Sequence, residues 1–252
     1  MYNLKKSLFM VVLGILCVLF IGNKAHSTQQ YFYQSETIDE CIREKECVWY
    51  AFERLSLSSS ALVAKWNRPI KIKVIGGYVN EAEAVIDTVS KSFPYEISVE
   101  STYDILLFFS EDVESDIEKY SSLFQNILED DVVYRFYKQL RNKECFNINF
   151  LGKKNIIDFS VVFVTVNPEI REACLNQHLF QALGFFQYIQ GFPFSVSNLG
   201  YEQPKEITQL DLFLLQILYD SKFKAHMTPD EKKKAFDEIY PVYLTHFLES
   251  QK

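Results

Sequence analysis

An apolar run at residues 157–166, IDFSVVFVTV, constrains the fold more than any other stretch of the chain. Apolar side chains occupy both alternating faces along most of its length, which is typical of a strand inside a sheet. Helical spacing of apolar residues follows directly in residues 174–187, CLNQHLFQALGFFQ. This order predicts a central strand joined to a helix that packs on the sheet.

Other segments predict the remaining elements of an α+β fold, a mixed twisted sheet with helices packed on it. Alternating apolar residues predict further strands at residues 68–77, 95–100, 103–109 and 145–151. Helical spacing predicts helices at residues 37–55, 80–93 and 207–220, and a last helix that begins at 227–231. Residues 111–140 are charged and helical in rhythm, and we interpret them as a helical insertion between two strands.

Three of these helices carry capping residues in the sequence. Asn80 is the expected cap of the helix at 80–93. Thr208 with Asp211, and Thr228 with Glu231, have the spacing of capping boxes at the starts of the two C-terminal helices.

The N-terminus has the layout of a secretory signal peptide. Lys5 and Lys6 precede an uncharged apolar block at residues 8–21, and Ala25 and Ser27 provide a small-residue cleavage site before residue 28. The block is shorter than the roughly 20 residues that a membrane span needs, so we favour cleavage over an uncleaved anchor. Residues 1–27 are therefore expected to contact the membrane only transiently, and the mature protein to be periplasmic or secreted.

The charge of the chain argues against nucleic acid as a partner. The sequence has 26 Lys and Arg against 33 Asp and Glu, and removal of residues 1–27 takes away three lysines, so the formal charge becomes 23 − 33 = −10. Binding to phosphates depends on clustered Lys and Arg, and no such cluster is present in the sequence.

Four cysteines remain after the predicted cleavage, which suggests disulfide bonds in an exported chain. Cys145 precedes a predicted strand and Cys174 begins the helix at 174–187, so a bridge between them would tie strand to helix. Cys41 and Cys47 would then pair by elimination, which requires a break in their helix near residues 43–46. Four cysteines permit three connectivities, and four unpaired thiols remain an alternative.

The helix at 174–187 keeps the spacing of the zinc-peptidase pattern H-E-x-x-H-x-x-G-x-x-H without its ligands. Gln177, Gln181 and Gln187 occupy the three ligand positions, His178 occupies the position of the catalytic glutamate, and Gly184 is retained. A neutral amide is a poor zinc ligand compared with imidazole, thiolate or carboxylate. We therefore expect no metal and no other cofactor.

The neighbouring segments carry a resemblance to two protein families. SVSN at 195–198, followed by the L-T-x-x-D-like pattern of the helix at 207–220, resembles the methionine turn and next helix of metzincin-type zinc peptidases. The order Cys174, Q-A-L-G at 181–184, the T-x-x-D and L-Y-D patterns and M-T at 227–228 resembles the bacterial exported family called domain of unknown function 2927. The resemblance implies a zincin-like domain at 65–252, with an active-site-type helix, a Met-turn-like loop and C-terminal helices, after an N-terminal helical segment at 28–64.

A binding or structural module in the cell envelope is the function that these features favour. Its protein or peptide ligand is unknown, and the expected cleft residues are Gln177, His178, Gln181, Gln187 and Tyr201. No catalytic residue is assigned and we lean against an enzyme; the alternative is a peptidase-like hydrolase that uses His178 in a non-standard site. A purely structural role, or a chance likeness of the helix within a different fold, completes the alternatives.

Overall fold

The computed structural model describes residues 34–56, 63–112, 115–116, 119, 145–199, 204–225 and 227–251 of the 252-residue chain. Its contacts divide the chain into two units, Met1–Gln34 and Ser35–Lys252, and the second unit contains all the helices and strands described below. The predicted signal segment, Tyr201 and most of the predicted insertion lie outside the described residues.

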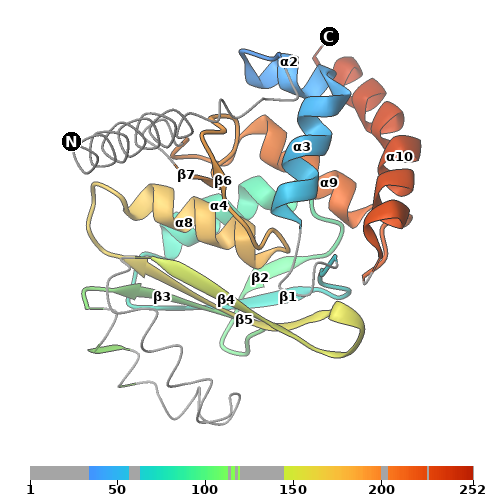
Figure 1. The fold of residues 1–252 in the computed structure, drawn as a ribbon. Helices are drawn as coiled ribbons and strands as arrows, with labels where there is room; N and C mark the ends of the chain where they lie inside the picture. The colour runs from blue at the N-terminus through green and yellow to red at the C-terminus, as the bar shows by residue number, and fades with distance from the viewer. Residues whose placement is uncertain are drawn as a thin grey trace, which may run out of the picture. The chain divides into compact units, whose positions relative to one another are not determined.

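A five-stranded mixed sheet is the centre of the fold (Figure 1). The strand order is β2-β1-β3-β5-β4, and every neighbouring pair is parallel except β4 with β5. The strands are β1 (Ile70–Ile75), β2 (Ile97–Val99), β3 (Ile105–Ser110), β4 (Phe146–Leu151) and β5 (Ile157–Thr165). The apolar run lies in β5, which has a neighbour on each side, as its composition predicted.

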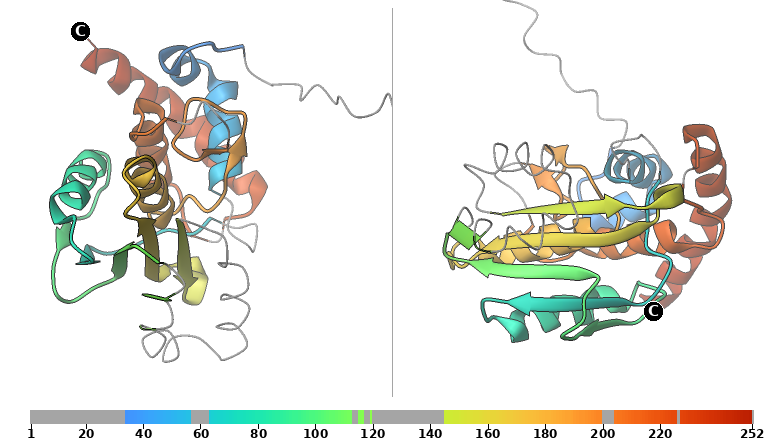
Figure 2. Two further views of the ribbon diagram at one scale, coloured as in Figure 1. Left: turned by 90° about the vertical axis from the view of Figure 1, so that its left-hand side faces the viewer. Right: turned by 90° about the horizontal axis from the view of Figure 1, so that it is seen from below.

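Two helices cover the same face of this sheet, as Figures 1 and 2 show. They are α4 (Val79–Ser90) and α8 (Arg171–Ala182), and α8 contacts both β5 and β4. Helices packed on a mixed sheet confirm the α+β character that the sequence predicted. The buried side of α4 consists of Ala82, Val85, Ile86 and Val89.

The predicted cap of α4 is wrong. Helix α4 begins at Val79, and its N-cap is Tyr78, whose backbone is left-handed (φ 58°, ψ 31°) and whose side chain makes no capping hydrogen bond. Gly76 and Gly77 also have positive φ, so three successive residues turn the chain sharply after β1 and start the helix earlier than Asn80. A Cβ on Gly76 would lie 2.1 Å from the Phe109 carbonyl oxygen, so this turn has no room for a larger residue.

The two N-terminal helices are separated by the predicted break. Helix α2 (Ile38–Arg43) and helix α3 (Lys45–Leu55) meet at Glu44, which has extended backbone angles (φ −93°, ψ 106°). This break lets Cys41 and Cys47 form a disulfide with their Cα atoms 5.2 Å apart.

The second predicted disulfide is also present. Cys145 and Cys174 are bonded with their Cα atoms 5.8 Å apart. Because Cys145 directly precedes β4 and Cys174 lies in the first turn of α8, the bond joins the edge strand to the helix. Both cysteine pairs that the sequence predicted are therefore confirmed.

The remaining elements form the C-terminal part of the chain and the short connections. They are the 3-10 turn η1 (Lys153–Asn155), the two-stranded pair β6 (Ile189–Gln190) and β7 (Asn198–Leu199), α9 (Gln209–Tyr219) and α10 (Pro229–Ser250). Both predicted capping boxes are present at the starts of α9 and α10. None of the helices within the described ranges is long and apolar enough to span a membrane. The two disulfides are compatible with a location outside the cytoplasm.

Candidate functional site

Helix α8 ends at a tightly packed glycine. Gly184 has φ +118°, and a Cβ there would lie 2.9 Å from the Ala64 carbonyl oxygen and 3.0 Å from Leu218 Cδ2. The last carbonyl groups of the helix accept hydrogen bonds from other elements, Ala182 O from Trp66 Nε1 at 2.9 Å and Leu183 O from the Tyr219 hydroxyl at 2.8 Å. The glycine of the peptidase-like pattern is thus accounted for by packing alone.

Three side chains of the peptidase-like pattern, all on α8, lie beneath the edge strand β4. Gln177, His178 and Gln181 are 8%, 2% and 1% exposed. His178 Nδ1 lies 3.2 Å from Asn147 Oδ1, and Asn149 Nδ2 donates to the Gln181 carbonyl at 3.0 Å.

Asn147 and Asn149 were missed by the sequence analysis. They alternate along β4, so both project from the same face of the strand toward α8. Polar residues at every second position of a predicted strand were the available signal. Which helix they face depends on the pairing of β4 with β5, which local sequence does not encode.

The predicted cleft residues are only partly brought together. Gln181 Nε2 lies 3.4 Å from the Gln187 carbonyl oxygen, whereas the Gln187 side chain itself is exposed. Tyr188, which the sequence analysis did not select, is 37% exposed and its ring centroid lies 6.4 Å from that of His178. Burial of the hydroxyl raises the pKa of Tyr188. Tyr201 lies outside the described residues.

The donor set at this place does not fit a zinc ion. The three positions that correspond to zinc ligands hold the neutral amides of Gln177, Gln181 and Gln187. The Nε2 group of Gln181 donates a hydrogen bond to a backbone carbonyl. Gln177 Nε2 is buried without a hydrogen-bond partner in the described part of the chain. Within the same residues, no three His, Cys, Asp or Glu side chains come close enough together to hold a metal.

A buried carboxylate organises the serine-containing turn next to α8. Asp211 accepts hydrogen bonds from Ser195 Oγ at 2.5 Å, Val196 N at 3.1 Å and Thr208 N at 2.9 Å. Its complete burial raises the pKa of this carboxyl group to about 6, although those hydrogen bonds by themselves lower the pKa. Asp211 therefore anchors the turn at 195–198 as well as capping α9, and it does not reach the surface.

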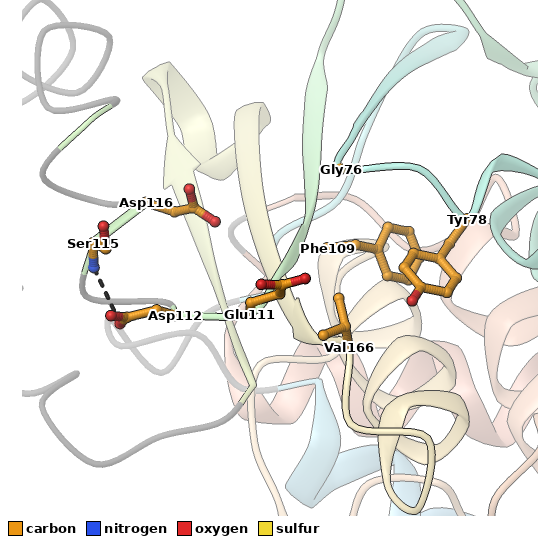
Figure 3. Close-up of a pocket in the computed structure, with 8 residues that line it drawn as sticks. All are labelled: Gly76, Tyr78, Phe109, Glu111, Asp112, Ser115, Asp116 and Val166. Carbon is orange, nitrogen blue, oxygen red and sulfur yellow. Dashed lines mark hydrogen bonds between the residues drawn. The ribbon is translucent and has the colours of Figure 1, made fainter.

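A solvent-exposed hollow lies away from these residues, at the carboxyl ends of β1, β3 and β5 (Figure 3). It has a volume of about 450 Å³ and is open to solvent. The rings of Tyr78 and Phe109, with centroids 5.0 Å apart, form one side, and Glu111, Asp112 and Asp116 lie on the other. None of Gln177, His178 and Gln181 lines it.

Comparison with protein families gives one match. The family described as "Protein of unknown function (DUF2927)" has a sequence model that matches residues 50–238. The chain belongs to this family. The DUF2927 match runs from within α3 to within α10, so it includes the Cys145–Cys174 bond, α8, the turn anchored by Asp211 and both capping boxes. Neither the curated proteins nor the solved structures contain a match to the chain.

Proposed function

We propose that this protein is exported to the periplasm or secreted, and that its zincin-like domain is a metal-free, non-catalytic module that binds an extended protein segment. The two disulfides support export, because such bonds persist in oxidising compartments. The order of elements supports the zincin-like assignment: an edge strand, a central strand, a helix followed by a tight glycine, a serine-containing turn and a capped helix follow one another.

The position of α8 beneath β4 is the observation that carries the proposal. In a zinc peptidase the ligand positions must present imidazoles to a metal that a substrate can reach. Here Gln177, His178 and Gln181 have nearly all of their surface covered by the protein itself, and Gln187, at the third ligand position, is an exposed neutral amide. The hydrolase alternative is disfavoured because His178, its candidate base, is 2% exposed.

Strand β4 provides the surface for a ligand. It has only one neighbour, β5, in the described sheet, so alternate backbone N–H and C=O groups along its other side have no ladder partner there. An extended peptide that pairs with this edge would gain main-chain hydrogen bonds and would lie next to the exposed Tyr188 and Gln187. The ligand contacts are therefore assigned to the strand edge and these two residues, and Gln177, His178 and Gln181 support the strand from below.

Metal content tests the metal-free part of the proposal. The full chain, expressed with its disulfides formed, is analysed for bound metal before and after incubation with zinc. We expect no stoichiometric zinc in either sample and no hydrolysis of unfolded protein substrates. Stoichiometric zinc that is lost in the His178→Ala variant would contradict the proposal.

Hydrogen exchange tests the binding part. An array of short synthetic peptides from exported proteins is screened, and the peptide that binds is added during amide exchange. We expect slower exchange at residues 146–151 and weaker binding by Tyr188→Ser. Val242→Ser is the matched control, because Val242 is also an exposed apolar residue, 53% exposed, but lies on α10. Protection confined to other elements would contradict the assignment to β4.

A further inference from the structure

A second, smaller cavity lies between α4 and α8, outside the surface proposed above. Its volume is about 280 Å³, and it is more enclosed than the hollow at the carboxyl ends of the strands. Ala84 and Val85 of α4 and Leu175 of α8 give it apolar walls. This size is near the lower end of the range for small-molecule sites, which combine apolar walls with a few polar groups.

Arg171 provides a positively charged group in this cavity. Its guanidinium group lies 4.3 Å from the centre of the Tyr78 ring, and Nη1 donates to the Val166 carbonyl at 3.1 Å. The nearest carboxylate oxygen, Glu81 Oε1, is 3.9 Å from Nη2, beyond hydrogen-bond distance. The guanidinium is thus held in place by a ring and one carbonyl, and it keeps further N–H donors for a ligand.

Asn176 adds a polar side chain to the wall of the cavity. The residue is 5% exposed and lines the cavity. Its Nδ2 donates to the Glu172 carbonyl at 3.0 Å, and its Oδ1 has no hydrogen-bond partner among the described residues. The oxygen can accept a hydrogen bond from a ligand in the cavity.

The charges around the cavity restrict the kind of ligand. Two carboxylates, Glu81 and Glu172, and one cation, Arg171, line the cavity. A simple anion would meet two carboxylates, and a simple amine would meet the guanidinium. A molecule with a carboxylate and an ammonium group would pair with both kinds of charge and could donate to Asn176 Oδ1.

We propose that the cavity between α4 and α8 binds a free α-amino acid with a small apolar side chain, of the leucine or valine type. The ligand carboxylate pairs with Arg171, its ammonium group lies near Asn176 Oδ1 and the two glutamates, and its side chain packs on Val85 and Leu175. This site is separate from the strand edge of β4, so either proposal can fail without the other.

Calorimetric or NMR titration of the full chain with L-leucine tests the inference. Two single-charge analogues, 4-methylpentanoate and isopentylamine, are titrated in parallel. We expect saturable binding of leucine and at least about tenfold weaker binding of each analogue, because each lacks one charge-assisted pair. Failure of leucine and valine to bind, or equal binding of an analogue, would overturn the proposal.

Two variants locate the binding. Ala84→Phe fills the cavity from an exposed position of α4 and is expected to abolish leucine binding, and Arg171→Gln to weaken it about 10- to 100-fold. Glu83→Phe is the matched control, because Glu83 is exposed on the same helix but does not line the cavity. Thermal unfolding of each variant shows that the fold is kept. Unchanged binding by Ala84→Phe would place the ligand elsewhere and overturn the inference.

Discussion

Replacing Asp211 by alanine is expected to destabilise the protein far more than replacing Glu231 by alanine. The two residues hold the same position in two capping boxes, Thr208 with Asp211 and Thr228 with Glu231. The box at α10 is exposed, so water can replace the lost carboxylate. The box at α9 is buried, and Asp211 is 0% exposed.

The expected magnitudes follow from the number of donors that each carboxylate satisfies. Loss of the exposed cap costs about 1 kcal/mol. Removal of Asp211 leaves Ser195 Oγ, Val196 N and Thr208 N buried without their acceptor, and buried unpaired donors cost about 1 to 3 kcal/mol each. We therefore expect Asp211→Ala to lower the free energy of unfolding by at least about 3 kcal/mol.

Urea denaturation of the disulfide-bonded protein, followed by tryptophan fluorescence and circular dichroism, measures both losses. Trp49 and Trp66 are the fluorescent reporters. Equal losses for Asp211→Ala and Glu231→Ala would refute the reasoning, because burial is the difference between the two boxes.

The pH dependence of the same carboxylate gives a second readout. The pKa of Asp211 is raised from 3.8 to about 6, so the folded state holds this proton more tightly than the unfolded state. The contribution of the group to stability is then fully present below about pH 4, and about 3 kcal/mol of it is lost as the pH rises through about 6. Asn cannot titrate, so the stability advantage of the wild type over Asp211→Asn should shrink across that window. An advantage that grows from pH 4 to pH 6 would contradict the raised pKa.

Two further predictions concern the glycine and the disulfides. Gly184→Ala should lower the free energy of unfolding by about 1 to 3 kcal/mol in the same denaturation assay, because φ is +118° and the new Cβ would meet a backbone oxygen; a neutral effect would mean that the chain relaxes there. Replacing both Cys145 and Cys174 by serine should cost about 3.5 kcal/mol, and replacing Cys41 and Cys47 about 2 kcal/mol, because the closed loops span 29 and 6 residues. The reverse order would contradict the chain-entropy argument.

The sequence by itself determined the elements whose signals are local. The apolar run of β5, the capping boxes of α9 and α10 and the break between α2 and α3 each depend on residues within a few positions of one another. The pairing of Cys145 with Cys174 was also predicted, because it followed from where a strand and a helix begin. Two helices were misplaced. Helix α4 begins before Asn80, since positive φ at three successive residues is not visible in hydrophobic spacing. The helix expected at 174–187 is Arg171–Ala182, so Gln187 lies beyond its end.

The tertiary structure alone decided what surrounds the candidate residues. β4 lies over α8 because it pairs antiparallel with β5, and this long-range pairing buries Gln177, His178 and Gln181. The same packing of distant segments buries Asp211 against the turn at 195–198 and forms the cavity between α4 and α8. Spacing along a helix shows which side chains share a face, but the element that covers that face depends on contacts between residues far apart in the chain.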